Sequence, residues 1–372
     1  MPQRIGIALV ALLSIALFVV GSLFRSSVAT PRTEAVELVF DEPRNYVCQR
    51  AESAIRIDGK LDESAWQAAD WSKDFVDIEG AIRPKPLYRT RVKMLWDDTH
   101  LYIAAELEEP HVWANATEHD SYIFHFDNDF EVFLDPDGDN HLYAELEMNA
   151  RNTTWDLLLV KPYQAGGPAI DAWEIVGLKS AVHVDGTLND SRDRDRGWTI
   201  EMAWPWSALR QIAGRPVPPK DGDQWRINFS RVQWQHEIVD GKYRKAANTK
   251  EDNWVWSPQG VIDMHRPERW GYVQFTATPA GMTAPPFRLD PSAPARELLH
   301  RLYWAQKDYH RQHGRYADTL ATLRLPRYIH PALGEPEMIA SATSFEITVP
   351  VRTQGIEERW QIRSDGRISK AK

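Results

Sequence analysis

The segment 127–161 constrains the fold most, because its apolar and polar side chains alternate with a period of two on both sides of an acidic turn. Successive side chains of a β-strand point to opposite faces, so this alternation predicts strands with one apolar and one polar face. The polar face collects carboxylates, an amide and aromatic rings. The apolar face of the expected hairpin consists of Phe130, Val132, Leu134, Leu142, Ala144, Leu146 and Met148.

Other parts of the chain show the same strand pattern and point to one fold class. Residues 55–66 predict a strand, an Asp-Gly turn and a short helix capped by Asp62, with Trp66 packed onto a sheet. Many short strands and few helices predict an all-β fold, an antiparallel β-sandwich of the jelly-roll type. The further strands are expected at 88–96, 101–108, 197–204, 225–230 and 269–275.

Composition shifts divide the chain of 372 residues into several parts. The apolar run 5–24, between Arg4 and Arg25, predicts either a cleaved signal peptide or a membrane anchor. Both alternatives predict export, to the periplasm or the extracellular space. The expected parts are a leader at 1–30, a linker at 31–45, the sandwich at 46–276, a linker at 277–294 and a small C-terminal α+β unit at 295–372.

Charge and cysteine content exclude several classes of function. The formal net charge of −9 argues against a nucleic-acid partner, which would select a basic surface. Cys48 is the only cysteine, so neither a disulfide framework nor a cysteine metal cluster is expected. The motifs HExxH, GxSxG and GxxxxGK[ST] do not occur, so metalloprotease, esterase and nucleotide-binding functions have no support.

The polar face of 127–156 has the composition of a sugar-binding surface. Sugar rings present apolar C–H faces to aromatic side chains and hydroxyl groups to carboxylates and amides, so a site needs both kinds of group on a rigid sheet. The candidate stacking platforms near strand ends are Trp113, Trp155, Trp254 and Trp256. The expected polar ligand-binding groups are Asp129, Glu131, Glu145, Glu147 and Asn149.

The acidic turn at 135–140 raises the alternative of a calcium site. An EF-hand loop requires Gly at its sixth position and Glu at its twelfth, which here are Asn140 and Leu146, so that motif is excluded. An irregular oxygen site and a hairpin turn that uses Asp and Gly for its geometry both stay open. The candidate metal ligands are Asp135, Asp137 and Asp139.

Five segments, in order along the chain, resemble the family 9 carbohydrate-binding modules and their DOMON-like sandwich relatives. The resemblance covers about residues 46–276. It implies a jelly-roll-like β-sandwich that binds sugars, often with structural calcium and often in secreted proteins that work on plant or microbial polysaccharides. The segments are IDGKLDESAW at 57–66, VKMLWDDTHLYIAAELEEP at 92–110, DNDFEVFLDPDGDNHLYAELEMNA at 127–150, GWTIEMAWPW at 197–206 and WSPQGVIDMHRPERWGYVQF at 256–275.

The chain departs from this family at one important place. The best-known members hold a terminal sugar between two tryptophans, and the matching positions here fall near His125 and Met264. The usual tryptophan clamp is therefore missing, although His125 can still stack on a ring. The resemblance thus implies the fold more firmly than it implies a particular sugar.

Two other functions stay open. Glu145 and Glu147 lie roughly 6–7 Å apart by strand rise and match the paired carboxylates of a glycoside hydrolase acting on O-glycosyl bonds, for example in xylan. A DOMON-like haem module needs a Met/His pair, for which Met148 or Met264 with His125 would serve, but Met148 is predicted to face the core. The expected partners are a carbohydrate ligand, a membrane if residues 5–24 are retained, and a glycoside hydrolase. No cofactor is expected apart from calcium at the acidic turn.

Overall fold

The computed structural model describes residues 35–39, 42–353 and 355–371. The predicted signal peptide or membrane anchor at 1–30 lies outside these residues. Within the described part, no helix combines the length and the apolar character that crossing a membrane requires.

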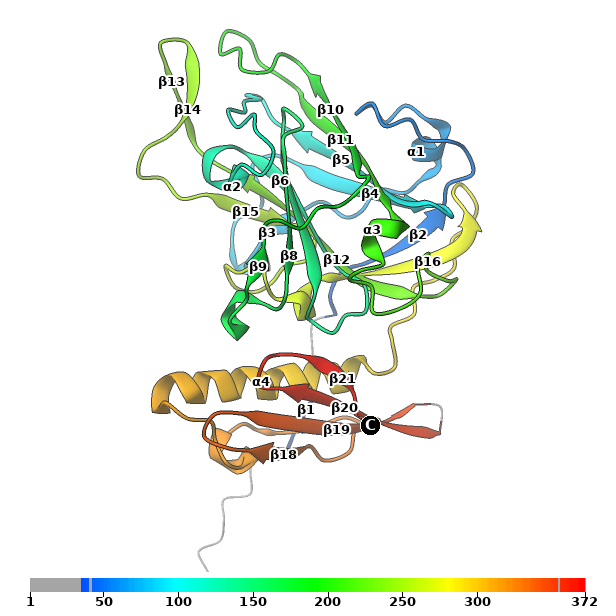
Figure 1. Cartoon of the computed structure of the whole chain (residues 1–372), viewed down its shortest axis with the longest axis vertical. Helices are drawn as coiled ribbons and strands as arrows, with labels where there is room; N and C mark the ends of the chain where they lie inside the picture. The colour runs from blue at the N-terminus through cyan, green and yellow to red at the C-terminus, as the bar shows by residue number, and fades with distance from the viewer. Residues whose placement is uncertain (1–34, 40–41, 354, 372) are drawn as a thin grey trace, which may run out of the picture.

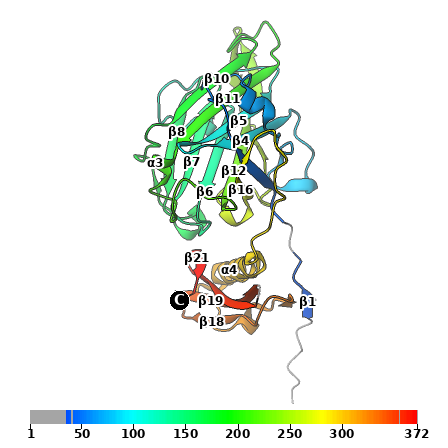
Figure 2. The same ribbon diagram turned by 90° about the vertical axis from the view of Figure 1, so that its right-hand side faces the viewer.

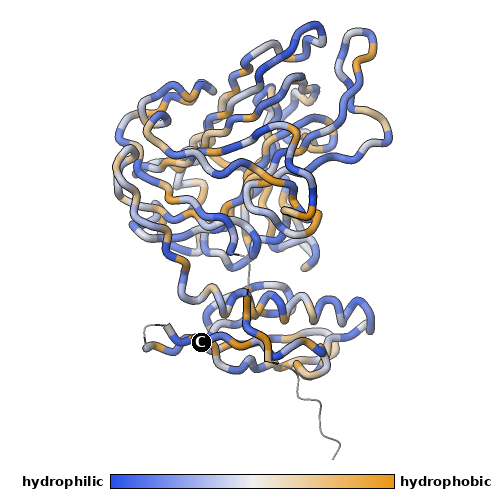
Figure 3. Tube along the Cα trace, turned by 180° about the vertical axis from the view of Figure 1, so that it is seen from behind, coloured by the Kyte–Doolittle hydropathy of each residue, from blue (hydrophilic) through white to orange (hydrophobic). Residues whose placement is uncertain are grey.

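Apolar and polar residues alternate along the strands, as half-buried sheets require (Figure 3).

Two layers of strands form the predicted β-sandwich (Figures 1 and 2). The first layer contains β2 (Asn45–Arg50), β4 (Thr90–Trp96), β5 (His100–Glu108), β10 (Lys179–Asp185) and β11 (Gly197–Pro205). The second contains β3 (Val76–Asp77), β6 (Asp129–Asp135), β7 (Tyr143–Asn149), β8 (Thr154–Leu159), β9 (Ala169–Ile170), β12 (Gln224–Gln233), β15 (Asp252–Val255) and β16 (Gly271–Pro279). Pairing is antiparallel except that β2 pairs in parallel with β4 and β16, which joins the two layers.

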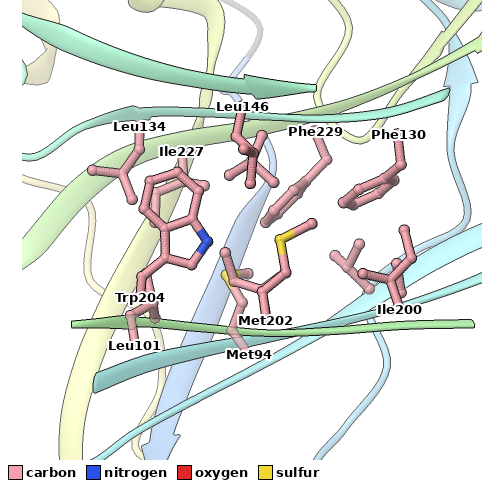
Figure 4. Close-up of a cluster of buried hydrophobic side chains, with 14 of the residues drawn as sticks. Met94, Leu101, Phe130, Leu134, Leu146, Ile200, Met202, Trp204, Ile227 and Phe229 are labelled. Atoms are coloured by element: carbon pink, nitrogen blue, oxygen red, sulfur yellow. The ribbon is translucent and has the colours of Figure 1, made fainter. Parts of the chain in front are cut away.

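Side chains from alternate positions of both layers fill the space between them (Figure 4). Phe130 and Leu146 enter it from the second layer, and Met202 and Trp204 enter it from the first; all four have no exposed surface. The predicted apolar face of 127–161 is therefore confirmed, with one exception. Leu142 is 42% exposed because it precedes β7 with a positive φ of 50°, which breaks the strand alternation.

The segment 57–66 covers the outer face of the first layer. Trp66 is fully buried on that face, as predicted. Helix α1 (Ser64–Ala68) has no side-chain cap, so the predicted capping by Asp62 is wrong. Gly59 has a φ of +85°, and a Cβ there would lie 2.5 Å from the backbone of β10, so only glycine fits this turn.

Short elements complete the sandwich and the segments around it. Helix α3 (Trp206–Leu209) begins directly after Pro205, whose fixed φ suits the start of a helix. The remaining elements are α2 (Ile123–Phe126), α3 (Trp206–Leu209), the hairpin of β13 (His236–Val239) and β14 (Lys242–Lys245), and the 3-10 helices η1 (Gly80–Ile82), η2 (Tyr163–Ala165), η3 (Pro267–Arg269) and η4 (Leu320–Leu323).

A small α+β unit follows the sandwich, as predicted (Figure 1). Helix α4 (Ala293–His313) packs on an antiparallel sheet of β18 (Glu337–Ala340), β19 (Phe345–Thr353), β20 (Ile356–Arg363) and β21 (Ile368–Lys370). The segments predicted as linkers contain structure: β16 and α4 both extend into 277–294, and β1 (Ala35–Glu37) in 31–45 pairs in parallel with β17 (Arg327–Ile329). A strand of three residues carries too little alternation to be recognised from sequence.

The acidic turn of the sandwich contacts the C-terminal unit directly. Asn140 donates a hydrogen bond from Nδ2 to the carbonyl of Gly366 (3.0 Å) and lies 2.9 Å from Nε2 of His300. Asp139 forms an ion pair with Arg367 at 2.7 Å. Asn140 and His300 are both buried, so these contacts hold the two units together.

Candidate functional site

Three buried glutamates from the adjacent strands β6 and β7 face the same side of the second layer. Glu131 pairs directly with Glu147 across the two strands, and Glu145 lies opposite Phe133. Each glutamate offers an oxygen, and these oxygens all lie within 4.8 Å of one another. The exposed fractions of Glu131, Glu145 and Glu147 are only 5%, 5% and 2%. The predicted polarity of both strands is thus confirmed, and the carboxylates meet at one point.

These glutamates form the floor of a pocket of about 200 Å³. Phe124 from α2 and the neighbouring residues Met264 and His265 line its walls. Sites for drug-sized ligands occupy about 300–1,000 Å³. The smaller pocket therefore admits one terminal ring or group rather than a segment of a polymer.

Aromatic rings lie next to residues that line this pocket. Tyr122 makes edge-on contacts with Trp155, at 4.7 Å between ring centroids, and with His125, at 4.3 Å. Tyr163 contacts the ring of His265 at 4.5 Å. Tyr122 and Tyr163 are 44% and 50% exposed, so both rings have surface that a ligand can contact.

Hydrogen bonds from the floor position the loop that carries this rim. Glu147 Oε2 accepts a hydrogen bond from the backbone amide of Phe124 at 3.0 Å. Asn149, expected to bind ligand, is fully buried and donates from Nδ2 to Asp127 and to a loop carbonyl, both at 2.9 Å. The prediction that Asn149 binds ligand is therefore corrected. Its side-chain amide instead holds the loop before β6.

The pKa values of the ionisable side chains at the floor are shifted toward their neutral forms. Burial raises the pKa of Glu131 to about 7. Burial first, and repulsion from neighbouring carboxylates second, raises the pKa of Glu145 and Glu147 well above the usual range. His265 lies 3.9 Å from Glu145, but burial lowers the pKa of the imidazole to about 4, so the ring is neutral at neutral pH. Asp129, on the same face, is fully buried and its Oδ2 has no hydrogen-bond partner.

The tryptophans divide between the pocket and the core. Trp155 is half-buried beside Tyr122 and stays a candidate for stacking. Trp254 is 3% exposed and lies opposite Arg231 on the face of β12 that points into the core, which contradicts its predicted contact with ligand. Its strand has four residues, too few to assign a face from alternation. Trp113 and Trp256 are each 1% exposed and also belong to the interior.

The three aspartates of the acidic turn are engaged in its own hydrogen bonds. Asp135 is fully buried and accepts from the backbone amides of Gly138 (3.0 Å) and Asn140 (2.9 Å). Asp137 accepts from the amide of Asp139 at 3.3 Å, and Asp139 also pairs with an arginine of the C-terminal unit. These contacts are those of a hairpin turn and explain its geometry without a metal. Calcium at this turn stays a prediction.

Several pocket residues were not predicted from the sequence. Phe124, Tyr122, Tyr163 and His265 lie outside the long strands, so no alternation marks them. The dense aromatic string YIFHF at 122–126 was the one available signal. Of the two methionines considered for a haem site, Met148 lies in the core, on the face of β7 opposite to this pocket, as expected, whereas Met264 lines the pocket.

A β-sandwich with a recessed polar floor and an aromatic rim on one sheet defines a ligand-binding sandwich. The family model described as carbohydrate family 9 binding domain-like matches residues 57–273. The chain therefore belongs to this family of carbohydrate-binding domains, and the resemblance seen in the sequence is confirmed.

Solved structures show similar folds at low identity. A family 9 carbohydrate-binding module from Caldicellulosiruptor kristjanssonii in complex with cellotriose is 14% identical, covers 66% of this chain and 100% of its own, and has a TM-score of 0.41. A module of the same family in complex with glucose, from the same organism, is 14% identical, covers 64% of this chain and 100% of its own, and has a TM-score of 0.41. A candidate carbohydrate-binding protein from Bacteroides uniformis ATCC 8492 is 18% identical, covers 63% of this chain and 100% of its own, and has a TM-score of 0.45. No curated protein matches this chain.

Proposed function

We propose that this chain is an exported, non-catalytic carbohydrate-binding protein that takes a terminal sugar ring in the pocket above Glu131, Glu145 and Glu147. One observation carries the proposal: buried carboxylates line the pocket, and the partly exposed rings of Tyr122 and Tyr163 contact the lining residues Phe124 and His265. Carboxylates suit sugar hydroxyls, and aromatic rings suit the apolar C–H faces of the same ring. Membership of the family supports the same assignment.

The arrangement of the carboxylates favours binding over hydrolysis. Glycoside hydrolases place two carboxyl groups on either side of the scissile bond, about 5–5.5 Å apart in retaining and about 6.5–9.5 Å apart in inverting enzymes. The glutamates here bring oxygens within 4.8 Å of one another and lie side by side on one floor. A sugar above this floor contacts all of them from the same side.

Export is the second part of the proposal and is supported by the apolar run at 5–24. A sugar-binding protein carried to the periplasm or the cell exterior would meet polysaccharide there. We propose that it works beside glycoside hydrolases in polysaccharide breakdown, either free or held at a membrane by this run.

A glycan array with purified protein tests the proposed function. We expect the wild type to bind at least one glycan, and we expect Glu131→Gln to lose most of this signal. Glu108→Gln is the matched control, since this carboxylate is 47% exposed on the other layer and should not affect binding. Release of reducing ends from xylan or glucan by the wild type would instead establish the hydrolase alternative.

A further inference from the structure

One oxygen at the floor of the pocket is buried with nothing to bind. Glu145 is 5% exposed, and its Oε2 has no hydrogen-bond partner among residues 35–39, 42–353 and 355–371. Its nearest basic neighbour is Nε2 of His265, at 3.9 Å, which is beyond hydrogen-bonding distance. A buried carboxylate oxygen without a partner is costly, so its retention at the bottom of a pocket points to a ligand that supplies the missing positive charge.

The rest of the pocket does not supply that charge. Within the part of the chain that the structure describes, its lining contains one histidine, no lysine and no arginine. It contains five acidic side chains, namely Glu131, Glu145, Glu147, Glu251 and Asp263. Among the described residues, the contact of His265 with Glu145 is the only pairing of a basic side chain with the three floor glutamates.

We infer that Glu131, Glu145 and Glu147 bind one divalent, oxygen-preferring cation of the calcium type at the floor of the pocket. Two oxygens on opposite sides of Ca²⁺ are separated by about 4.6–5.2 Å, twice the usual Ca–O distance of about 2.3–2.6 Å. The three glutamate oxygens lie within 4.8 Å of one another, so one ion can contact all of them. An all-carboxylate set selects hard cations over the softer transition metals.

The position of the ion would leave part of its coordination shell open to the pocket. Calcium takes about 6–8 oxygens, and three carboxylates do not fill that number unless all bind through both oxygens. Adjacent hydroxyl groups of a sugar can occupy the remaining positions. This role in glycan binding rests on the proposed function, whereas binding of the ion itself does not.

Terbium luminescence on metal-free full-length protein tests the inference. Tb³⁺ replaces calcium at oxygen sites and is sensitised by nearby indole rings, here Trp155. We expect saturable luminescence that Ca²⁺ displaces, and at least a tenfold weaker affinity in Glu145→Gln. This substitution keeps the shape of the side chain and breaks no hydrogen bond of Oε2, so the variant should fold.

Controls separate this site from the other acidic groups of the chain. Asp137→Asn in the acidic turn and Glu174→Gln, near His119 and Asp156, should leave the displaceable signal at the pocket unchanged. Equal affinity in Glu145→Gln and wild type, or no binding of Ca²⁺ up to ~10 mM, above the ~1 mM of weak extracellular calcium modules, would overturn the inference. Binding of glucosamine without any metal would also overturn it, and would assign the floor to an ammonium group.

Glycan binding measured with calcium and with chelator distinguishes the two proposals. If the ion binds but no glycan does, the proposed function fails and the cation site stands. If a glycan binds equally well in chelator and no ion is detected, the cation site fails and the proposed function stands.

Discussion

Glu131 and Glu147 lie directly opposite each other on β6 and β7, and each is at least 95% buried (5% and 2% exposed). Like charges at a directly opposed pair destabilise a sheet. The two strands nevertheless align them, and Glu145 adds a third carboxylate next to them. A sheet selected only for stability would not collect three carboxylates in its interior, so this arrangement is best explained by a ligand.

Trp155 should contribute directly to glycan affinity. Its ring stands at the rim beside Tyr122, where it can stack on an apolar sugar face. We expect Trp155→Ala to weaken binding about tenfold, or ~1.4 kcal/mol, by isothermal titration calorimetry. Trp71→Ala is the control, because the Trp71 ring packs against Arg91 of β4 in the first layer, 4.1 Å from the guanidinium carbon, whereas the pocket lies on the second layer. Equal losses in both variants would contradict the assignment.

The crowded carboxylates should cost stability in a pH-dependent way. The pKa of Glu131 rises from 4.5 to about 7 on folding, and the pKa of Glu145 rises as well. The folded state then holds more protons than the unfolded state between these values, so stability falls as pH rises through about 7. Urea unfolding in the presence of chelator measures this effect. The free energy of unfolding of Glu145→Gln should exceed that of the wild type by about 1 kcal/mol at pH 8 and equal it at pH 5. A variant destabilised at both pH values would refute this.

Glu201 should be essential for stability but not for binding. This fully buried carboxylate accepts hydrogen bonds from the amides of Asp58 (2.9 Å) and Gly59 (2.7 Å) and from Nε1 of Trp66 (2.7 Å). Truncation to alanine leaves three buried donors unsatisfied and should cost about 3 kcal/mol or more. Thermal unfolding measures the loss. Exposed Glu52→Ala serves as a control, and a similar small change in both variants would show that Glu201 does not anchor the 57–66 segment.

The contact between the two units should weaken in acid. Burial lowers the pKa of His300 from 6.5 to about 4, and Asn140 donates to the same ring nitrogen that a proton would occupy. A histidine with a depressed pKa contributes stability that is present above 6.5 and lost as pH falls toward 4. The loss is at most about 3 kcal/mol. Limited proteolysis of 280–292 should increase below pH 6, and His300→Gln should remove most of this pH dependence. An unchanged profile in the variant would exclude His300 as its cause.

Long alternating strands made the sandwich predictable. The seven residues of β6 place Glu131 and Phe130 on opposite faces, and a period of two allows only one such assignment once the apolar side is known. The cross-strand partners of β6 and β7 follow from the turn between them. The floor of the pocket could therefore be read from the sequence as a set of carboxylates on one face.

The rim could not be predicted in the same way. Phe124 comes from the short helix α2 and His265 from a loop far away in the chain, and only the folded structure brings them to one pocket. Trp254 has the residue type of a sugar platform but faces the core, because β15 is too short to show its polarity. Asn149 lies on the predicted face, yet its amide is used by a loop whose path carries no sequence signal.

A crystal structure of the protein with a glycan identified by the array tests the central claim most directly. We expect a terminal sugar above Glu131 and Glu147, with hydroxyl oxygens about 2.5–3.0 Å from their carboxylates and one sugar face against Tyr122 or Trp155. The main competing location is the open groove of about 790 Å³ that Arg89, Glu108 and Trp198 help to line. A glycan found in that groove, with the floor glutamates untouched, would contradict the account.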